Sequence, residues 1–292
     1  MKKKNEPFFQ MEKNGGPWRN KILIATPSTG IVRMEWVMAR YGQIIPTNWA
    51  ETKIIQWMNN YVPVEYLLPD AENLIAKAVI EGNYEWLLMI EEDNILPQDA
   101  FLKINDYIRE GDVPVVSGLY FTKSVPPEPI LYRGRGTGSY QNFKIGDKVW
   151  VDGIPFGFCL IHSSIIKALW DESPEYQVGP HTTRRVFEAP DRATIDENGM
   201  FASISGTTDL NFCSKIIDNN IFEKAGWPEY QMMEYPFLVD TNIFLNHIDQ
   251  QGRMFPLGGI PVKYKNDEKT KRNIQNKSKS AKKRNTKKST KR

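Results

Sequence analysis

The sequence predicts an α/β fold, in which a mainly parallel central sheet is flanked by helices. Short apolar runs alternate along the chain with segments of helical spacing, a pattern typical of strands joined by right-handed helical crossovers. The run Trp86–Ile90 contains no charged residue, as expected of a strand buried on both faces. It leads directly into Glu91, Glu92 and Asp93. Because open parallel sheets bind ligands at the carboxyl ends of their strands, these acids indicate a ligand site.

The strands are predicted from apolar runs that end at turn-forming residues. In chain order they are expected at residues 21–25, 86–90 and 113–120, as two adjacent pieces around Gly153 and Gly157 within 149–161, and at 236–240. Residues 61–68 are expected to be extended. The helices are predicted from apolar residues at helical spacing, such as Val32, Trp36 and Tyr41. They are expected at residues 31–42, 71–81, 98–110, 163–170 and 209–219.

Three connecting segments are predicted to be loops. Residues 26–30 are turn-rich but lack the Gly-Lys-Ser/Thr ending of a phosphate-cradling loop. Residues 124–147 are rich in Pro and Gly and predict a long loop or an edge hairpin. Residues 171–206 are polar and predict an irregular loop, and a loop of that length is often functional.

The charge distribution divides the chain into a body and a tail. From Lys263 onward there are 14 Lys or Arg and 2 acids, a net charge of +12. The remaining residues carry 24 basic and 33 acidic side chains, a net charge of −9, which argues against nucleic acid as the main ligand of the body. We therefore predict a flexible arm at 1–19, one domain at 20–262 and a disordered Lys-rich tail at 263–292.

The tail is expected to be dispensable for catalysis. It is either a solvated appendage or a contact to an anionic surface, such as nucleic acid or phospholipid headgroups. The only cysteines, Cys159 and Cys213, lie in apolar stretches and are predicted to be buried thiols. No apolar region follows the basic N-terminus and no stretch reaches the roughly 20 apolar residues of a membrane span. The sequence thus predicts a soluble, cytoplasmic protein without a signal peptide.

The acids after residue 90 allow a metal site. Glu91 and Asp93 are one residue apart and can share a hard divalent cation that also holds phosphate oxygens. Two simpler interpretations remain open: a solvated acidic turn, and a helix N-cap in which Asp93 precedes the helix after Pro97.

Four motifs in the expected order extend this interpretation. They are residues 87–97, residues 115–121, residues 157–161, and a final series of Thr208–Cys213, Val239–Thr241 and His247. Over residues 20–262 the chain resembles the inverting, family-two-like glycosyltransferases of the GT-A fold, which are common in bacteria and viruses. The resemblance implies transfer of a sugar from a nucleotide-diphosphate sugar to an unknown acceptor, with Mn²⁺ or Mg²⁺ across the pyrophosphate.

The resemblance also implies roles for individual residues. Asp93 would bind the metal directly, Glu91 would assist, and His247 would be a third ligand that favours Mn²⁺. Asp209 would be the general base that takes the proton of the acceptor hydroxyl. Capping of the following helix is the alternative for Asp209.

The predicted substrate contacts come from several segments. On the donor side, Thr26, Pro27 and Asn73 are expected by position, and Glu92 is structural or faces the ribose. Two further residues of the donor side, Arg184 and Arg185, are predicted from charge and placement to close over the diphosphate. On the acceptor side, the expected residues are Gly157, before the acceptor-side helix, and Trp170, whose ring could stack on a sugar.

The chain departs from the family pattern at three positions. Glu91 replaces the usual Asp, Glu72 stands where many relatives have Arg, and Thr208 replaces a Glu. These departures leave two alternatives open. One is a catalytically degenerate relative that binds glycan or serves as a scaffold. The other is a sugar-phosphate nucleotidyltransferase, although those enzymes usually begin with a Gly-rich, Lys- or Arg-bearing loop.

Overall fold

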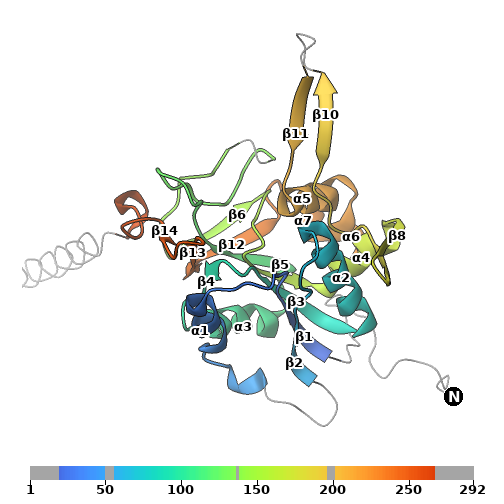
Figure 1. The fold of residues 1–292 in the computed structure, drawn as a ribbon, viewed down its shortest axis with the longest axis horizontal. Helices are drawn as coiled ribbons and strands as arrows, with labels where there is room; N and C mark the ends of the chain where they lie inside the picture. Colours follow the sequence, from blue (N-terminus) through green and yellow to red (C-terminus); the bar gives the residue numbers. More distant parts are fainter. Residues whose placement is uncertain (1–19, 50–55, 136–137, 196–200, 267–292) are drawn as a thin grey trace, which may run out of the picture.

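A seven-stranded sheet forms the centre of the structure, a computed structural model that describes residues 20–49, 56–135, 138–195 and 201–266 (Figure 1). Its strands, in spatial order, are β2 (Gln56–Tyr61), β1 (Asn20–Ala25), β3 (Tyr84–Ile90), β7 (Phe158–His162), β5 (Val115–Leu119), β12 (Phe237–Phe244) and β6 (Lys148–Val151). Five of the seven run in one direction, and β7 and β6 run against them. The predicted α/β fold with a mainly parallel central sheet is confirmed.

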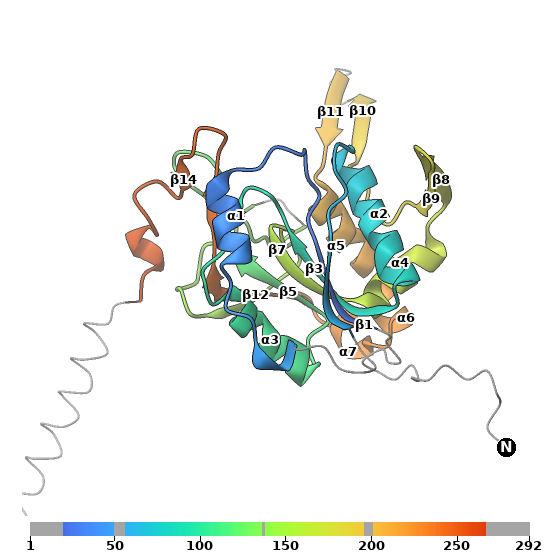
Figure 2. The same cartoon turned by 60° about the horizontal axis from the view of Figure 1, so that its bottom comes forward.

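Helices cover both faces of this sheet (Figure 2). The five predicted helices are present as α1 (Met34–Tyr41), α2 (Leu68–Glu81), α3 (Ala100–Glu110), α4 (Ser163–Glu172) and α5 (Thr208–Asp218). The helices α2 and α4 pack on each other and on β3. The helix α3 lies near α1. The ring of Phe101 in α3 packs below the guanidinium of Arg40 in α1, and it lies 5.2 Å from the ring of Trp49. Two short helices that the sequence did not predict, α6 (Ile221–Lys224) and α7 (Pro228–Gln231), follow α5.

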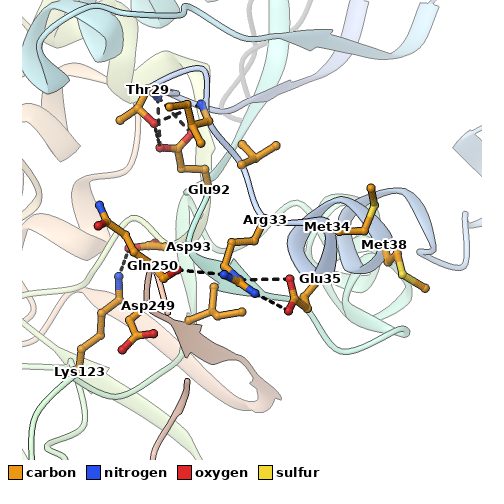
Figure 3. A pocket seen from close by; sticks show the side chains of 13 residues that line it. Thr29, Arg33, Met34, Glu35, Met38, Glu92, Asp93, Lys123, Asp249 and Gln250 are labelled. Atoms are coloured by element: carbon orange, nitrogen blue, oxygen red, sulfur yellow. Dashed lines mark hydrogen bonds and ion pairs between the residues drawn. The ribbon is translucent and has the colours of Figure 1, made fainter. Parts of the chain in front are cut away.

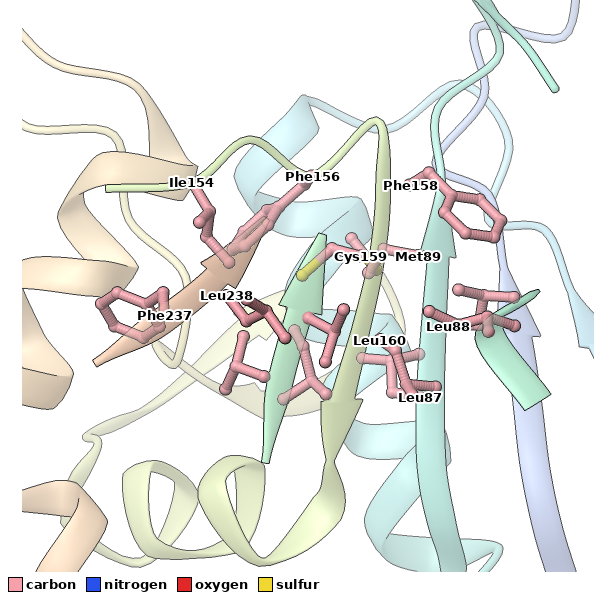
Figure 4. Close-up of a cluster of buried hydrophobic side chains, with 14 of the residues drawn as sticks. Leu87, Leu88, Met89, Ile154, Phe156, Phe158, Cys159, Leu160, Phe237 and Leu238 are labelled. Atoms are coloured by element: carbon pink, nitrogen blue, oxygen red, sulfur yellow. The ribbon is translucent and has the colours of Figure 1, made fainter. Parts of the chain in front are cut away.

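The middle of the sheet is the core of the domain. Every side chain from Trp86 to Ile90 on β3 is fully buried, as the apolar run predicted. Figure 4 shows Leu88 and Met89 of β3 beside Leu160 and Cys159 of β7, the residues to which they are paired. Full burial of each such side chain stabilises the fold by about 1.5–3 kcal/mol. This rigid strand therefore fixes the position of the carboxylates that follow it.

Of residues 61–68, which the sequence predicted to be extended, only Tyr61 belongs to a strand, and Val64 forms an isolated parallel bridge with Ser28. The strand β2 ends at Tyr61, and α2 already begins at Leu68, with Pro69 in its first turn. The strand lies at the edge of the sheet, where Asn59 and Asn60 are exposed. A half-exposed edge strand does not produce a continuous apolar run, and its signal in the sequence is weak.

The predicted irregular loop at 171–206 contains two antiparallel hairpins. One pairs β8 (Glu175–Val178) with β9 (His181–Arg184), and the other pairs β10 (Asp191–Ile195) with β11 (Phe201–Ser205). Figure 1 shows the second hairpin projecting from the body beside α5. The first turns at Gly179, whose positive φ of 55° suits glycine. Its polar strands lack the apolar alternation on which the prediction depended.

The packed chain reaches beyond residue 262. A short 3₁₀ turn covers Val262–Tyr264, and Tyr264, which the sequence placed in the tail, is fully buried with its ring stacked at 4.7 Å on Phe143. The predicted arm at 1–19 and the tail after Asn266 lie outside the described residues.

Both cysteines are buried free thiols, as predicted. In the part of the chain that the structure describes, no helix combines the length and apolar character needed to cross a membrane.

Candidate functional site

The carboxylates after β3 lie in a turn held by the backbone of neighbouring segments. The Glu91 backbone N–H donates to the carbonyl oxygen of Gly157 at 3.2 Å, and the indole N–H of Trp36 donates to the Glu91 carbonyl oxygen at 2.8 Å. The N-cap of α3 is Asp99, so the capping role considered for Asp93 does not apply. The turn therefore presents Glu91, Glu92 and Asp93 at the end of the sheet with their side chains available for other contacts.

A second, three-stranded sheet brings His247 to these carboxylates. It consists of β4 (Asn94–Ile95), β13 (Asn246–Ile248) and β14 (Met254–Phe255), and it pairs His247 with Asn94. The Nε2 atom of His247 lies 3.2 Å from Oδ2 of Asp93, and its Nδ1 lies 3.0 Å from the carbonyl oxygen of Phe121. With a proton on Nε2 the ring donates to Asp93, whereas with a proton on Nδ1 alone the Nε2 lone pair faces Asp93 and a cation can lie between them.

Lys123 supplies a cation that the sequence analysis missed. Its ammonium group forms an ion pair with Oδ2 of Asp93. Burial opposes the charge of Asp93, but hydrogen bonds and charge from His247 and Lys123 prevail and lower the pKa of Asp93 to about 2. A signal for Lys123 was present, since it follows the strand β5 just as the acids follow β3, and parallel strands end at the same edge.

Glu91 is held apart from Asp93 by an amide. The Asn94 Nδ2 donates to Oε2 of Glu91 at 3.3 Å and to Oδ1 of Asp93 at 3.1 Å. The Tyr120 hydroxyl donates to the same Glu91 oxygen at 3.3 Å while it accepts the Gly157 N–H at 2.9 Å. Burial, and then the charge of Asp93, raise the pKa of Glu91 to about 8. At neutral pH the two carboxyl groups therefore differ: Asp93 is ionised and Glu91 is mostly protonated.

Gly157 is required by the close packing of this site. A Cβ at this position would lie 2.4 Å from Nδ2 of Asn94 and 2.5 Å from ring carbons of Tyr120, the two residues that hold Glu91. We expect Gly157→Ala to destabilise the protein by about 1–3 kcal/mol, because the crowded side chains must leave their rotamers. Urea unfolding of the variant measures this loss. Gly138→Ala is the matched control, because a Cβ there meets nothing within 4 Å. An equal response of the two variants would contradict this account.

Glu92 points toward the loop after β1. Its carboxylate accepts from the Ser28 hydroxyl at 2.5 Å, from the Thr29 hydroxyl at 2.7 Å and from the Thr29 backbone N–H. The two residues that the sequence favoured in this loop, Thr26 and Pro27, are buried, and the backbone N–H of Thr26 binds the Tyr61 carbonyl. The loop thus meets the acidic turn through the next two residues. Figure 3 shows the contact between Thr29 and Glu92.

A cleft of about 1060 Å³ opens beside the acidic turn (Figure 3). Its polar end contains Glu92, Asp93 and Lys123. The remaining wall comes from the start of α1 and from the turn after β13, and it comprises Thr29, Ile31, Val32, Arg33, Met34, Glu35, Met38, Ile248, Asp249 and Gln250. The volume suffices for a ligand of nucleotide-sugar size.

Asp209 approaches the carboxylates from α5. It is the second residue of this helix, whose N-cap is Thr207, and its Oδ1 accepts the Leu210 backbone N–H at 2.8 Å. Capping by Asp209 itself is therefore not its role. Burial raises the pKa of Asp209, and its charge contributes to the raised pKa values of Glu91 and Tyr120. Asp209 thus belongs to the same electrostatic environment as the acidic turn.

A buried acid lies behind Asp209. Glu72 of α2 is fully buried, and its Oε1 accepts the Thr208 hydroxyl at 3.0 Å. Its other oxygen, Oε2, is buried without a hydrogen-bond partner among the described residues. Burial raises the pKa of Glu72 well above its usual value, which favours the protonated form of this carboxyl group in the folded state. Two of the three positions at which the sequence departs from the glycosyltransferase pattern that it resembles, 72 and 208, are in direct contact.

Four residues that were predicted to contact the substrates belong to the first hairpin or contact it. They are Asn73, Trp170, Arg184 and Arg185. The Asn73 amide is buried and bonds the Tyr176 hydroxyl and the backbone of Phe187. Arg184 donates to the Trp170 carbonyl and pairs with Glu175. The guanidinium of Arg185 lies 4.9 Å from the Tyr176 ring. The structure does not bring these four residues to the acidic turn, because residues 175–184 form strands that pack beside α2 and α4 rather than a loop that is free to close.

The donor set fits a divalent cation that has few protein ligands. Among the residues that the structure describes, no three His, Cys, Asp or Glu side chains are arranged to hold an ion. Asp93 and His247 are adjacent, however, and Mg²⁺ or Mn²⁺ bound to a diphosphate needs only one or two protein ligands because phosphate and water oxygens complete its coordination. For such an ion to bind, Lys123 must leave Oδ2 of Asp93.

Comparisons with known proteins find similar solved structures but no matching family model. No protein-family model matches, and neither does any curated protein. Among solved structures, the chain is similar to A197 from STIV, with 14% sequence identity and a TM-score of 0.46 over 79% of this chain and 87% of that one. It is also similar to S. aureus TarS 1–349 in complex with UDP, with 10% identity and a TM-score of 0.28 over 51% of this chain and 48% of that one. TM-scores below 0.5 are too low to assign a function.

Proposed function

We propose that this chain is a metal-dependent glycosyltransferase of the GT-A type, which moves a sugar from a nucleotide-diphosphate sugar to an acceptor hydroxyl with inversion. The observation that supports this best is the meeting of Asp93, His247 and Lys123 at one end of a large cleft. These groups come from three distant segments, and together they offer a carboxylate, an imidazole and an ammonium group. This is a suitable environment for a diphosphate with its cation.

The residues around the cleft would bind different parts of the donor. Asp93 and His247 would hold Mn²⁺ or Mg²⁺, which supplies Lewis-acid stabilisation of the leaving diphosphate. Lys123, released from Asp93, would contribute a second positive charge to the phosphates. Glu92, oriented by Ser28 and Thr29, offers carboxylate oxygens to hydroxyl groups of the donor.

Asp209 would accept the proton of the attacking hydroxyl. As the acceptor oxygen bonds to the anomeric carbon, the bond from that carbon to the diphosphate oxygen breaks and the proton passes to the carboxylate. The raised pKa of Asp209 makes it a better proton acceptor than an exposed aspartate. The ionised form is the active one, so transfer should decline as the pH falls through this raised pKa.

One observation favours a second candidate. The Lys123 ammonium already neutralises Asp93, an arrangement that also suits a protein that binds glycan or serves as a scaffold without a metal. Metal-dependent nucleotide binding separates the two candidates.

A thermal-shift panel tests the donor site directly. UDP, GDP, CMP and dTDP are each added with Mn²⁺ and with EDTA. A ligand at about 100 times its Kd stabilises the folded state by roughly 2.7 kcal/mol. We expect one nucleotide to raise the Tm of wild type with Mn²⁺ only, and to leave the Tm of Asp93→Asn unchanged.

The control for this panel is Asp106→Asn, an exposed carboxylate on α3 that should respond as wild type does. If no nucleotide raises the Tm of wild type, the donor site is wrong and the glycan-binding or scaffold candidate takes its place. If stabilisation persists in EDTA, the metal is not part of the site.

A further inference from the structure

The segment from Ile31 to Ile45 turns its apolar side chains outward. Each exposed residue in it is apolar or glycine, and Ile31 is 87% exposed, Met34 67% and Met38 70%. We define the apolar face as the set Ile31, Val32, Met34, Met38, Tyr41, Ile44 and Ile45. On α1 itself the spacing of residues 34, 38 and 41 places three of these side chains on one side of the helix.

The charged residues of the same segment are buried or paired, and the Arg33–Glu35 pair lies partly exposed at the edge of this face. Arg40 is buried and donates to the Asn60 side chain, while Glu35 pairs with Arg33, which also donates to the Gln250 carbonyl. Trp36 fixes the inner side of the helix by its bond to the Glu91 carbonyl. An exposed helix normally presents charged residues to water, and a contiguous apolar patch marks an interaction surface.

Positive charge accompanies this face. Figures 1 and 2 both show the segment from β14 to the end of the described chain on the same side of the molecule as α1. That segment includes the exposed residues Lys263 and Lys265, and the exposed apolar residues Met254, Leu257 and Val262. The described chain ends here at Asn266, and the remaining 26 residues carry 12 Lys or Arg against 2 acids.

We propose that the apolar face docks this protein on an anionic phospholipid surface, with the basic segment from Lys263 onward at the headgroups. Apolar side chains that enter the interface and basic residues that meet anionic lipids are the two contributions that hold an amphipathic surface on a membrane. Either one alone binds weakly, and here they lie on one side of the protein. A second copy of the chain fits this surface less well, because a symmetric contact would bring two basic segments together. Nucleic acid would leave the apolar side chains without a partner.

The position of the cleft gives this docking a consequence. Ile31, Val32, Met34 and Met38 belong both to the apolar face and to the wall of the cleft that reaches Asp93. A docked protein would therefore hold the opening of its cleft at the lipid interface. The proposal concerns binding alone and does not depend on transferase activity.

Sedimentation of the full chain with vesicles tests the proposal. One set of vesicles is phosphatidylcholine and the other adds phosphatidylserine. We expect binding to the anionic set, at least about tenfold weaker binding to the neutral set, and loss of binding as salt is raised. Met34→Ser/Met38→Ser should weaken binding to anionic vesicles by about tenfold or more, because insertion of both side chains is lost. Lys263→Glu/Lys265→Glu should weaken it in the same direction.

Met232→Ser is the matched control, because Met232 is also 87% exposed but lies at the end of α7, outside the apolar face. It should bind as wild type does, and the Tm of each variant shows that it is folded. Absence of binding to either set of vesicles overturns the proposal. So does wild-type binding by Met34→Ser/Met38→Ser, which would assign the contact to the basic segment alone. If wild type is instead a dimer that this variant dissociates, a second copy covers the face.

Discussion

Replacement of Asp209 by Asn is expected to lower kcat for sugar transfer by about 10²–10⁴-fold, the usual contribution of a positioned general base. The amide is similar in size to the carboxylate and can still accept the Leu210 N–H through its oxygen, so the start of α5 should keep its geometry. It cannot take a proton from the acceptor. The measurement is the initial rate of transfer with the nucleotide sugar whose base the thermal-shift panel selects.

The same variant must keep its response to the donor nucleotide. A thermal shift equal to that of wild type, together with the loss of kcat, separates a general base from a residue of the donor site. Asp218→Asn is the matched control, since Asp218 is an exposed residue at the last turn of the same helix and pairs with Arg135. If Asp209→Asn loses the nucleotide response instead, its proposed role is wrong.

Replacement of Glu72 by Gln is expected to change how stability depends on pH. In the folded protein this carboxyl group is buried and keeps its proton, whereas in the unfolded chain it ionises near its usual pKa of 4.5. The folded state therefore binds one more proton above that pH, and wild type loses about 1.4 kcal/mol of stability per pH unit until the pH reaches the raised pKa. The Gln variant has no proton to lose at this position, so its stability relative to wild type should increase with pH.

Urea unfolding of both proteins at several pH values between 5 and 8 measures this difference. Glu91, whose pKa is also raised, contributes a loss of the same sign, but it is present in both proteins and cancels in the comparison. Glu81→Gln, an exposed position at the end of the same helix, should follow wild type at every pH. Parallel curves for wild type and Glu72→Gln would show that Glu72 is ionised in the folded state.

The contact between Glu72 and Thr208 places a hydroxyl group beside a buried carboxyl group. A hydroxyl group can donate to a buried carboxyl group, as the 3.0 Å bond shows, whereas a glutamate at position 208 would face Glu72 with a second carboxyl group in the same buried space. Two such groups repel each other when ionised, and desolvation adds to the cost. Thr208 is thus compatible with Glu72, and the neighbouring Asp209 keeps its place at the start of α5.

Those parts of the fold that depend on local pattern can be predicted from the amino-acid sequence. The apolar run of β3 predicted a buried central strand, and the acids after it predicted a polar site at its carboxyl end, because burial on both faces leaves a direct record in composition. The polar edge strand β2 and the two hairpins contain no continuous apolar run, so the sequence analysis misplaced or missed them. The motif series named His247, but only the fold brings it within 3.2 Å of Asp93.

Which side chains share the site depends on contacts between distant elements. The β4–β13 pairing positions His247, the end of β5 positions Lys123, and the packing of the first hairpin on α2 draws Asn73 and Arg184 into another set of contacts. The outward orientation of Met34 and Met38 belongs to the same category, since helical spacing predicts an apolar side without saying whether the core or the solvent receives it. Such contacts join residues far apart in sequence, and their partners are set by how whole elements pack rather than by any local preference.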